Sequence, residues 1–91
     1  MKNVVIRGEE FDSMAAVHDY LADNLSFPEY YGKNLSALYD VLTEEDQETR
    51  IEIDFENMQD QEMIRSLERM VDVISDATAE NELLELTVLE I

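Results

Sequence analysis

Residues 28–40, PEYYGKNLSALYD, group aromatic, amide and acidic side chains more densely than the rest of the chain. A carboxylate such as that of Asp40 can accept two hydrogen bonds at once from a guanidinium group, as a phosphate does. Aromatic rings next to it, such as that of Tyr39, supply flat apolar area of the kind that is enriched at protein interfaces. We therefore interpret the segment as a recognition surface in which Asp40 stands in for a phosphate.

The second half of this segment has the spacing of a helix that begins after Asn34, its expected N-cap, and runs to about Thr43. One face of that helix is apolar and is expected to dock on a sheet: Leu35, Leu38, Val41 and Leu42. The opposite, outward face carries residues at i, i+3, i+4 and i+7: Ser36, Tyr39, Asp40 and Thr43. In the loop before it, Gly32 is expected to allow a close backbone approach or a positive φ. One of Tyr30 and Tyr31 is expected to pack into the core.

Each of these residues also has an ordinary structural explanation. Asn34 can be a cap and nothing more, and Asp40 can be a solvated helix carboxylate. For any one residue that explanation is favoured. The combination of all of them on one side of one helix favours recognition.

Twenty-three acidic and six basic residues give the 91-residue chain a formal net charge of −17. Nucleic acid and anionic membrane are excluded as partners, because both require cationic groups to neutralise phosphates. A basic protein is a suitable partner, since opposite fields accelerate association. The alternative is a surface that serves solubility without any partner.

The length predicts a single domain over residues 1–91. There is no cysteine for a disulfide or thiolate site, and no apolar stretch exceeds the four residues 14–17. We therefore expect a cytoplasmic protein without a membrane span.

Hydrophobic periodicity predicts alternating strands and helices. The strands are expected at residues 3–7, 50–55 and 83–91. Helices are expected from Asp12 or Ser13 to Phe27-Pro28, over 34–43, and from Met63 to Asn81, with a short helical turn within 56–61. The order is β-α-α-β-α-α-β, an α/β class with a small three-stranded parallel sheet.

An enzyme is disfavoured by the composition. His18 is the single histidine, beside Asp19, and is expected to be a surface or half-buried structural residue. Two glycines cannot form a Gly-rich phosphate loop. Asp72 with Asp76, and Asp76 with Glu80, are spaced to bind a divalent cation weakly, but a solvated helix face is the better interpretation. We predict no catalytic residues, no metal and no cofactor.

Residues 27–43, FPEYYGKNLSALYDVLT, resemble the barstar family, intracellular inhibitors of the basic secreted ribonuclease barnase. That family has Leu-Pro-Glu-Tyr-Tyr-Gly-Glu-Asn-Leu, then an aspartate, alanine, leucine, an aromatic residue and an aspartate, at the same place. The match has no gaps, and the order of elements agrees over essentially the whole chain. Residues 74–81, ISDATAEN, are similar to the family's distal acidic segment. The resemblance implies a barstar-like fold and a 1:1 complex with a basic secreted ribonuclease. We expect the protein to be a monomer when it is free.

Position by position, the resemblance implies that Asp40 enters the nuclease active site and that Tyr30 stacks on the catalytic histidine there. Tyr39 takes an aromatic position that is tryptophan in the family, and Asp76 matches a peripheral carboxylate. The predicted partner-binding residues are Tyr30, Gly32, Lys33, Asn34, Leu35, Ser36, Ala37, Tyr39, Asp40, Thr43, Asp76 and Glu80.

Three departures from the family pattern bear on the partner. Ser36 replaces an aspartate and Lys33 replaces a glutamate, which fits a different ribonuclease with an acid opposite Lys33. Residues 43–49, TEEDQET, stand where a tryptophan is expected, and are either a solvated loop or an aid to electrostatic steering. Two other functions remain open: an acidic module of the same fold that binds another basic protein, such as a non-ribonuclease toxin, and a variant that keeps the fold without a partner.

Overall fold

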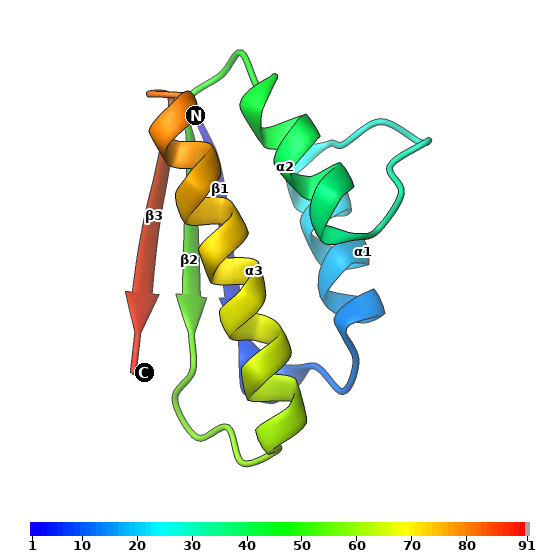
Figure 1. The fold of residues 1–91 in the computed structure, drawn as a ribbon, viewed down its shortest axis with the longest axis vertical. Coiled ribbons are helices and arrows are strands. Elements are labelled where there is room, and N and C mark those ends of the chain that lie inside the picture. Colours follow the sequence, from blue (N-terminus) through cyan, green and yellow to red (C-terminus); the bar gives the residue numbers. More distant parts are fainter. Residues whose placement is uncertain (91) are drawn as a thin grey trace.

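A computed structural model of the chain describes residues 1–90. The elements in order are β1 (Lys2–Arg7), the 3₁₀ turn η1 (Gly8–Glu10), α1 (Met14–Leu25), α2 (Leu35–Thr43), β2 (Thr49–Asp54), α3 (Gln61–Glu80) and β3 (Leu84–Leu89). The strands form one parallel sheet in the order β1-β2-β3, with α3 running in front of it and α1 and α2 to one side (Figure 1). The predicted α/β class with a three-stranded parallel sheet is confirmed.

Two local predictions differ from the structure. Residues 56–60 form a turn and irregular backbone instead of the predicted helical turn, and residue 61 already belongs to α3. Asn57 adopts a left-handed φ of 66° in this turn, which the Met58 N–H closes on the Phe55 carbonyl. The first helix ends before Phe27-Pro28: Ser26, at φ 57°, is its left-handed C-cap. Ile91, the last residue of the predicted final strand, lies outside the described residues.

The core lies between the helices and one face of the sheet. Val4 pairs in register with Ile51, and Ile6 with Ile53, and all four side chains are buried. Alternate residues such as Val5 point to the other face and are exposed. Parallel sheets are usually covered on both faces, so this open and largely polar face is a distinctive feature of the fold.

The end of α3 is tied to the segment that follows α2. The Asn81 side chain, at the C-cap of α3, donates to the carbonyls of Leu42 and Glu45, both at 2.9 Å. These bonds satisfy carbonyls at the end of α2 and hold that end against α3. Within residues 1–90, no helix combines the length and the apolar character needed to cross a bilayer.

Candidate functional site

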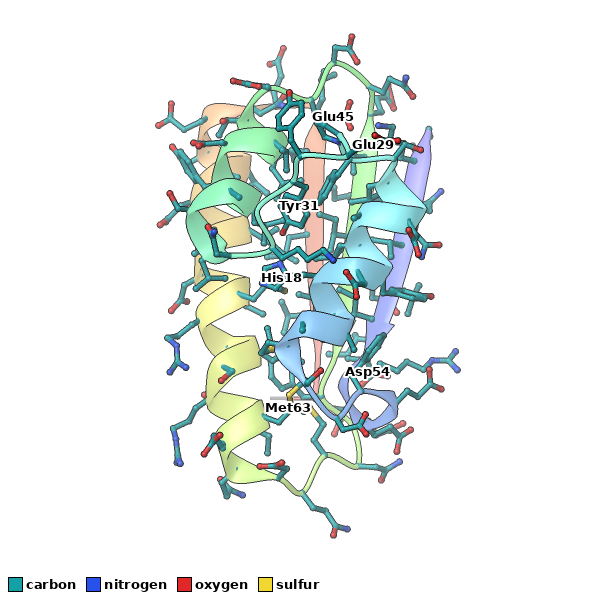
Figure 2. All side chains as sticks on the ribbon, turned by 90° about the vertical axis from the view of Figure 1, so that its right-hand side faces the viewer. His18, Glu29, Tyr31, Glu45, Asp54 and Met63 are labelled. Carbon is teal, nitrogen blue, oxygen red and sulfur yellow. The ribbon has the colours of Figure 1, made fainter. Side chains whose placement is uncertain are left out.

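The two adjacent tyrosines in the loop between α1 and α2 have opposite environments, one buried and one exposed. Tyr31 is 7% exposed, and its ring packs edge-on against Phe27 at a centroid distance of 4.9 Å. Its hydroxyl oxygen lies 2.6 Å from Nδ1 of His18 on α1, and Figure 2 shows Tyr31 above His18 on the inner side of the loop. Tyr30, by contrast, is 86% exposed. The prediction that one of the two rings enters the core is confirmed, and anchoring Tyr31 leaves Tyr30 in solvent.

His18 is more deeply buried than the sequence analysis predicts, with 4% of its surface exposed. Burial lowers the pKa of His18, although the charge of Asp19 acts in the opposite direction. Burial also raises the pKa of Tyr31 to about 12. At neutral pH, therefore, two uncharged groups share this hydrogen bond, and it fixes the loop to α1.

A second contact attaches the same loop to the next residue of α1. Nζ of Lys33 lies 2.7 Å from Oδ1 of Asp19, and both side chains are about half exposed. The hydrogen bond that Lys33 donates to Asp19, with the charges of Asp19 and Asp23, raises the pKa of Lys33. The ammonium thus has a partner within its own molecule. Lys33 also takes the left-handed φ of 54° for which Gly32 was a candidate; Gly32 itself has no positive φ.

Gly32 is needed for a different reason, which is close approach. A Cβ at this position would lie 3.1 Å from Nδ2 of Asn34 and 3.4 Å from Cβ of Ala37. Nδ2 of Asn34 donates to the Gly32 carbonyl, while Oδ1 accepts the Ala37 N–H at 2.8 Å. Asn34 is therefore the N-cap of α2, as predicted, and it also folds the loop onto the start of the helix.

On the outward face of α2 the predicted residues divide into exposed and partly buried ones. Asp40 and Ser36 are exposed, whereas Tyr39, predicted to be exposed, is half-buried and packs against the core, as does Leu35. The Thr43 hydroxyl donates to the Tyr39 and Asp40 carbonyls, so it is used within its own helix. Within residues 1–90 the ion pairs are Lys2–Glu45, Lys33–Asp19 and Arg50–Glu85. Asp40 takes part in none of them.

A groove of about 500 Å³ lies between the loop and α2. It is lined by Lys2, Ser26, Phe27, Pro28, Tyr30, Tyr31, Gly32, Ala37, Asp40, Val41, Glu44 and Glu45. Of the predicted binding residues it brings together Tyr30, Gly32, Ala37 and Asp40. Asp76 and Glu80 are exposed on α3, outside the groove.

The acidic run after α2 is partly structural, which neither of the two sequence interpretations anticipates. Nζ of Lys2 donates to Oε1 of Glu45 at 2.6 Å and to the Leu25 carbonyl at 2.8 Å. Oε2 of Glu45 accepts the N–H groups of Asp46 and Gln47. Burial alone would raise the pKa of Glu45, but Lys2 and these N–H donors together hold it below its usual value.

Sequence reasoning also missed residues that form the groove walls. Phe27 and Pro28 were considered only as a helix end, and Glu44 only as part of a charge run. Their closeness in sequence to predicted binding residues could have indicated them. Pro28 lies two residues before Tyr30, and Glu44 lies one helical turn after Asp40.

Comparison with known proteins gives the family. The family model described as "Barstar (barnase inhibitor)" matches residues 1–89. The chain belongs to the barstar family. A curated relative from Bacillus subtilis (strain 168), named "Putative ribonuclease inhibitor YrdF", is 49% identical over 43 residues. The aligned stretch covers 47% of this chain and 47% of the relative, so it spans about half the relative's length.

Proposed function

We propose that the chain inhibits a basic secreted ribonuclease of the barnase type, in a 1:1 complex that blocks the substrate cleft. Membership of the barstar family supports this proposal, as does similarity to a relative that is named as a ribonuclease inhibitor. The protein performs no catalysis in this proposal; it occupies the site where another protein binds RNA.

The observation that carries the proposal is the state of Asp40. Its carboxylate is exposed, it stands at the wall of the groove beside Tyr30, and no cation within residues 1–90 forms an ion pair with it. A ribonuclease active site concentrates positive charge to stabilise the phosphorane. A carboxylate on a helix can form bidentate hydrogen bonds with arginine there, as a phosphate would.

The surroundings of Asp40 are already ordered before a partner arrives. Tyr31 is attached to His18, Lys33 is attached to Asp19, and Asn34 caps the helix that carries Asp40. Holding a binding surface in its bound shape reduces the entropy lost on association. The net charge of −17 supports rapid encounter with a basic enzyme.

The proposal is tested by measuring RNA cleavage by a panel of purified barnase-type ribonucleases with wild-type protein and with Asp40→Ala. Truncating one member of a desolvated charge pair leaves the other charge buried, so we expect the inhibition constant to rise roughly 30-fold or more. Asp72→Ala, an exposed aspartate on α3, is the matched control and should leave inhibition unchanged.

Failure to inhibit any ribonuclease of the panel would contradict the proposal, and so would inhibition that Asp40→Ala does not weaken. Affinity capture of a basic protein that does not cleave RNA would instead support the alternative function, an acidic interaction module of the same fold.

A further inference from the structure

Strand β3 forms one edge of the sheet, because β2 pairs with it on one side and no strand within residues 1–90 pairs with the other. Figure 1 shows it on the outer side of the sheet, with α3 in front and with α1 and α2 toward the opposite edge. Proteins usually protect such an edge with lysine, proline or a bulge, since its free backbone groups can pair with another chain. Residues 84–89, LELTVL, contain neither lysine nor proline, and their register with β2 has no bulge.

Leu86 and Val88 carry the free backbone groups of this edge. In a parallel ladder the N–H and C=O of one residue turn to the same neighbouring strand, and successive residues alternate between the two sides. The Phe55 N–H donates to the Leu89 carbonyl at 2.9 Å, so Leu89 and the other odd-numbered residues of β3 turn to β2. Leu86 and Val88 therefore turn both backbone groups to the open edge.

The side chains of the same two residues are apolar and incompletely covered. Leu86 and Val88 point toward the helices and pack against the core, yet both remain partly exposed. An added strand would place its inward side chains directly beside them and would extend the apolar surface of the sheet. The edge thus offers main-chain hydrogen bonds and side-chain contacts together, which is the combination that strand addition uses.

A hollow of about 310 Å³ adjoins the end of this edge. It is lined by Phe55, Glu68, Val71 and Asp72, and Phe55 is bonded through its N–H to Leu89 of β3. Glu68 and Asp72 are exposed and take part in none of the ion pairs within residues 1–90. The hollow therefore has an apolar floor and an acidic rim, which suit the methylene stem and the charged end of arginine or lysine.

Charge distinguishes between the two kinds of chain that could pair with an open strand edge. A second copy of this chain also carries a formal net charge of −17, and pairing through β3 would bring the Glu68 carboxylates of both copies toward each other. A basic segment is instead attracted by the field of the whole molecule and neutralises the carboxylates at the hollow. The charges favour a basic partner.

We propose that the β3 edge adds an extended basic segment of another protein as a fourth strand of the sheet. The backbone of the segment pairs with Leu86 and Val88, and an apolar side chain of it packs beside Leu86. An arginine or lysine next to Val88 enters the hollow and pairs with Glu68. No residue lines both this hollow and the groove beside Asp40, so the surface is a second one and does not depend on the proposed function.

The first test examines the free edge without any partner. Amide hydrogen exchange of a dilute sample, followed by NMR and corrected for intrinsic rates, should be roughly tenfold or more faster at Leu86 and Val88 than at Glu85 and Thr87, which turn to β2. Equal protection of all four amides would show that the edge is already covered and would overturn the proposal. Protection that grows with protein concentration would assign the edge to a second copy, which also overturns it.

The second test adds a probe, the acetylated and amidated peptide Thr-Val-Thr-Arg-Thr-Val-Thr, whose valines and arginine share one face of a strand. In about 0.05 M NaCl it should shift the amide signals of Leu86 and Val88 and slow their exchange, while those of Tyr30 and Asp40 stay unchanged. The peptide with glutamate in place of arginine should bind more weakly. Shifts confined to the groove, or equal binding of the two peptides, would contradict the proposal.

Matched variants separate strand pairing from general attraction between opposite charges. Glu68→Gln should raise the dissociation constant of the arginine peptide about threefold, the effect of losing one exposed ion pair. Glu10→Gln removes the same charge from η1, which follows the strand at the opposite edge, and should change the constant by less than about 1.5-fold. Equal effects of the two substitutions would show attraction by net charge alone and would overturn the site.

N-methylated forms of the peptide test the backbone contacts directly. Methyl groups on one alternate set of amides would block the hydrogen bonds to β3, whereas methyl groups on the other set would point away from it. We expect one form to lose binding and the other to keep its dissociation constant within about twofold of the parent peptide. Binding that both forms retain, or that both lose, would overturn strand addition.

Discussion

His18 and Tyr31 are polar side chains that the fold buries together, and each satisfies the other's hydrogen bond. A buried polar group that loses its partner is costly, because it has given up its hydrogen bonds to water. The pair therefore stabilises the fold only while both members are present. The same hydrogen bond fixes the loop to α1.

Removing only the hydroxyl of Tyr31 tests this dependence. Tyr31→Phe leaves Nδ1 of His18 buried without its partner, and we expect the free energy of unfolding to fall by about 1–3 kcal/mol. Urea denaturation measures the change. Tyr30→Phe removes an exposed hydroxyl and should alter stability by less than about 0.5 kcal/mol. Equal effects of the two substitutions would contradict a structural role for the buried pair.

The burial of His18 also predicts a dependence of stability on pH. Its pKa in the folded state lies below the ordinary value of 6.5, so the unfolded chain binds the proton more readily. The contribution of neutral His18 to the free energy of unfolding is complete above pH 6.5. It is lost as the pH falls from there through the pKa of His18 in the folded state. We expect urea midpoints to decrease over this range in wild type and to decrease less in His18→Gln. A wild-type midpoint that rises on acidification through this range would show that the sign is wrong.

At the scale of elements, α2 depends on the chemistry at its two ends. Asn34 begins it and links it to Gly32, while the Asn81 side chain accounts for carbonyls at its end. Asp40 is thus carried on a short helix that is fixed at both termini. These contacts at the two ends of α2 therefore fix the position of the Asp40 carboxylate.

The two helix caps offer a matched comparison. Asn34→Ala and Ser13→Ala each remove an N-cap side chain, and we expect each to lower the free energy of unfolding by about 1 kcal/mol. Only Asn34→Ala should also weaken inhibition, because it releases the loop next to the groove, whereas Ser13 caps α1 at its distant end. Urea denaturation and the ribonuclease assay measure the two properties. Comparable losses of inhibition in both variants would indicate general destabilisation instead.

Periodicity and capping explain why much of this architecture could be predicted. The 3.6-residue pattern in α3 and the cap at Asn34 are local signals, and they place those helices within one or two residues. The groove could not be predicted in the same way. Its Lys2–Glu45 contact joins residues 43 positions apart, and nothing local to either residue indicates the other.

The backbone conformation of the loop between α1 and α2 could not be predicted from the sequence either. A glycine in a turn suggests a positive φ, yet Lys33 adopts it and Gly32 does not. The Lys33–Asp19 contact provides a reason, since it draws the lysine side chain back toward α1. Such a contact depends on how α1 and the loop meet in space, which the one-dimensional pattern does not encode.

At the scale of the whole molecule, the charge of −17 has two consequences of opposite sign. Like charges within the folded protein repel each other, which lowers its stability at low ionic strength. The same field attracts a basic partner and accelerates encounter. Salt screens both effects, since the Debye length is about 10 Å at 0.1 M.

We therefore predict that raising the NaCl concentration from 0.01 to about 0.5 M slows association with a basic ribonuclease and raises the melting temperature of the free protein. Stopped-flow mixing measures the association rate, and thermal melting measures stability. The dissociation rate should change much less, because contacts at the interface are short and desolvated. An association rate that does not change with salt would contradict a steering role for the surface charge.

The face of the sheet opposite the helices is exposed to solvent and takes no part in the groove. Thr87 of β3 is exposed on this face. It pairs with Glu52 of β2, which in turn pairs with Val5 of β1. A chain without native cysteine would acquire a single reactive thiol from Thr87→Cys. A dye or a sensor surface attached there would leave the groove facing outward, so the protein can be immobilised in one orientation while its recognition surface stays accessible.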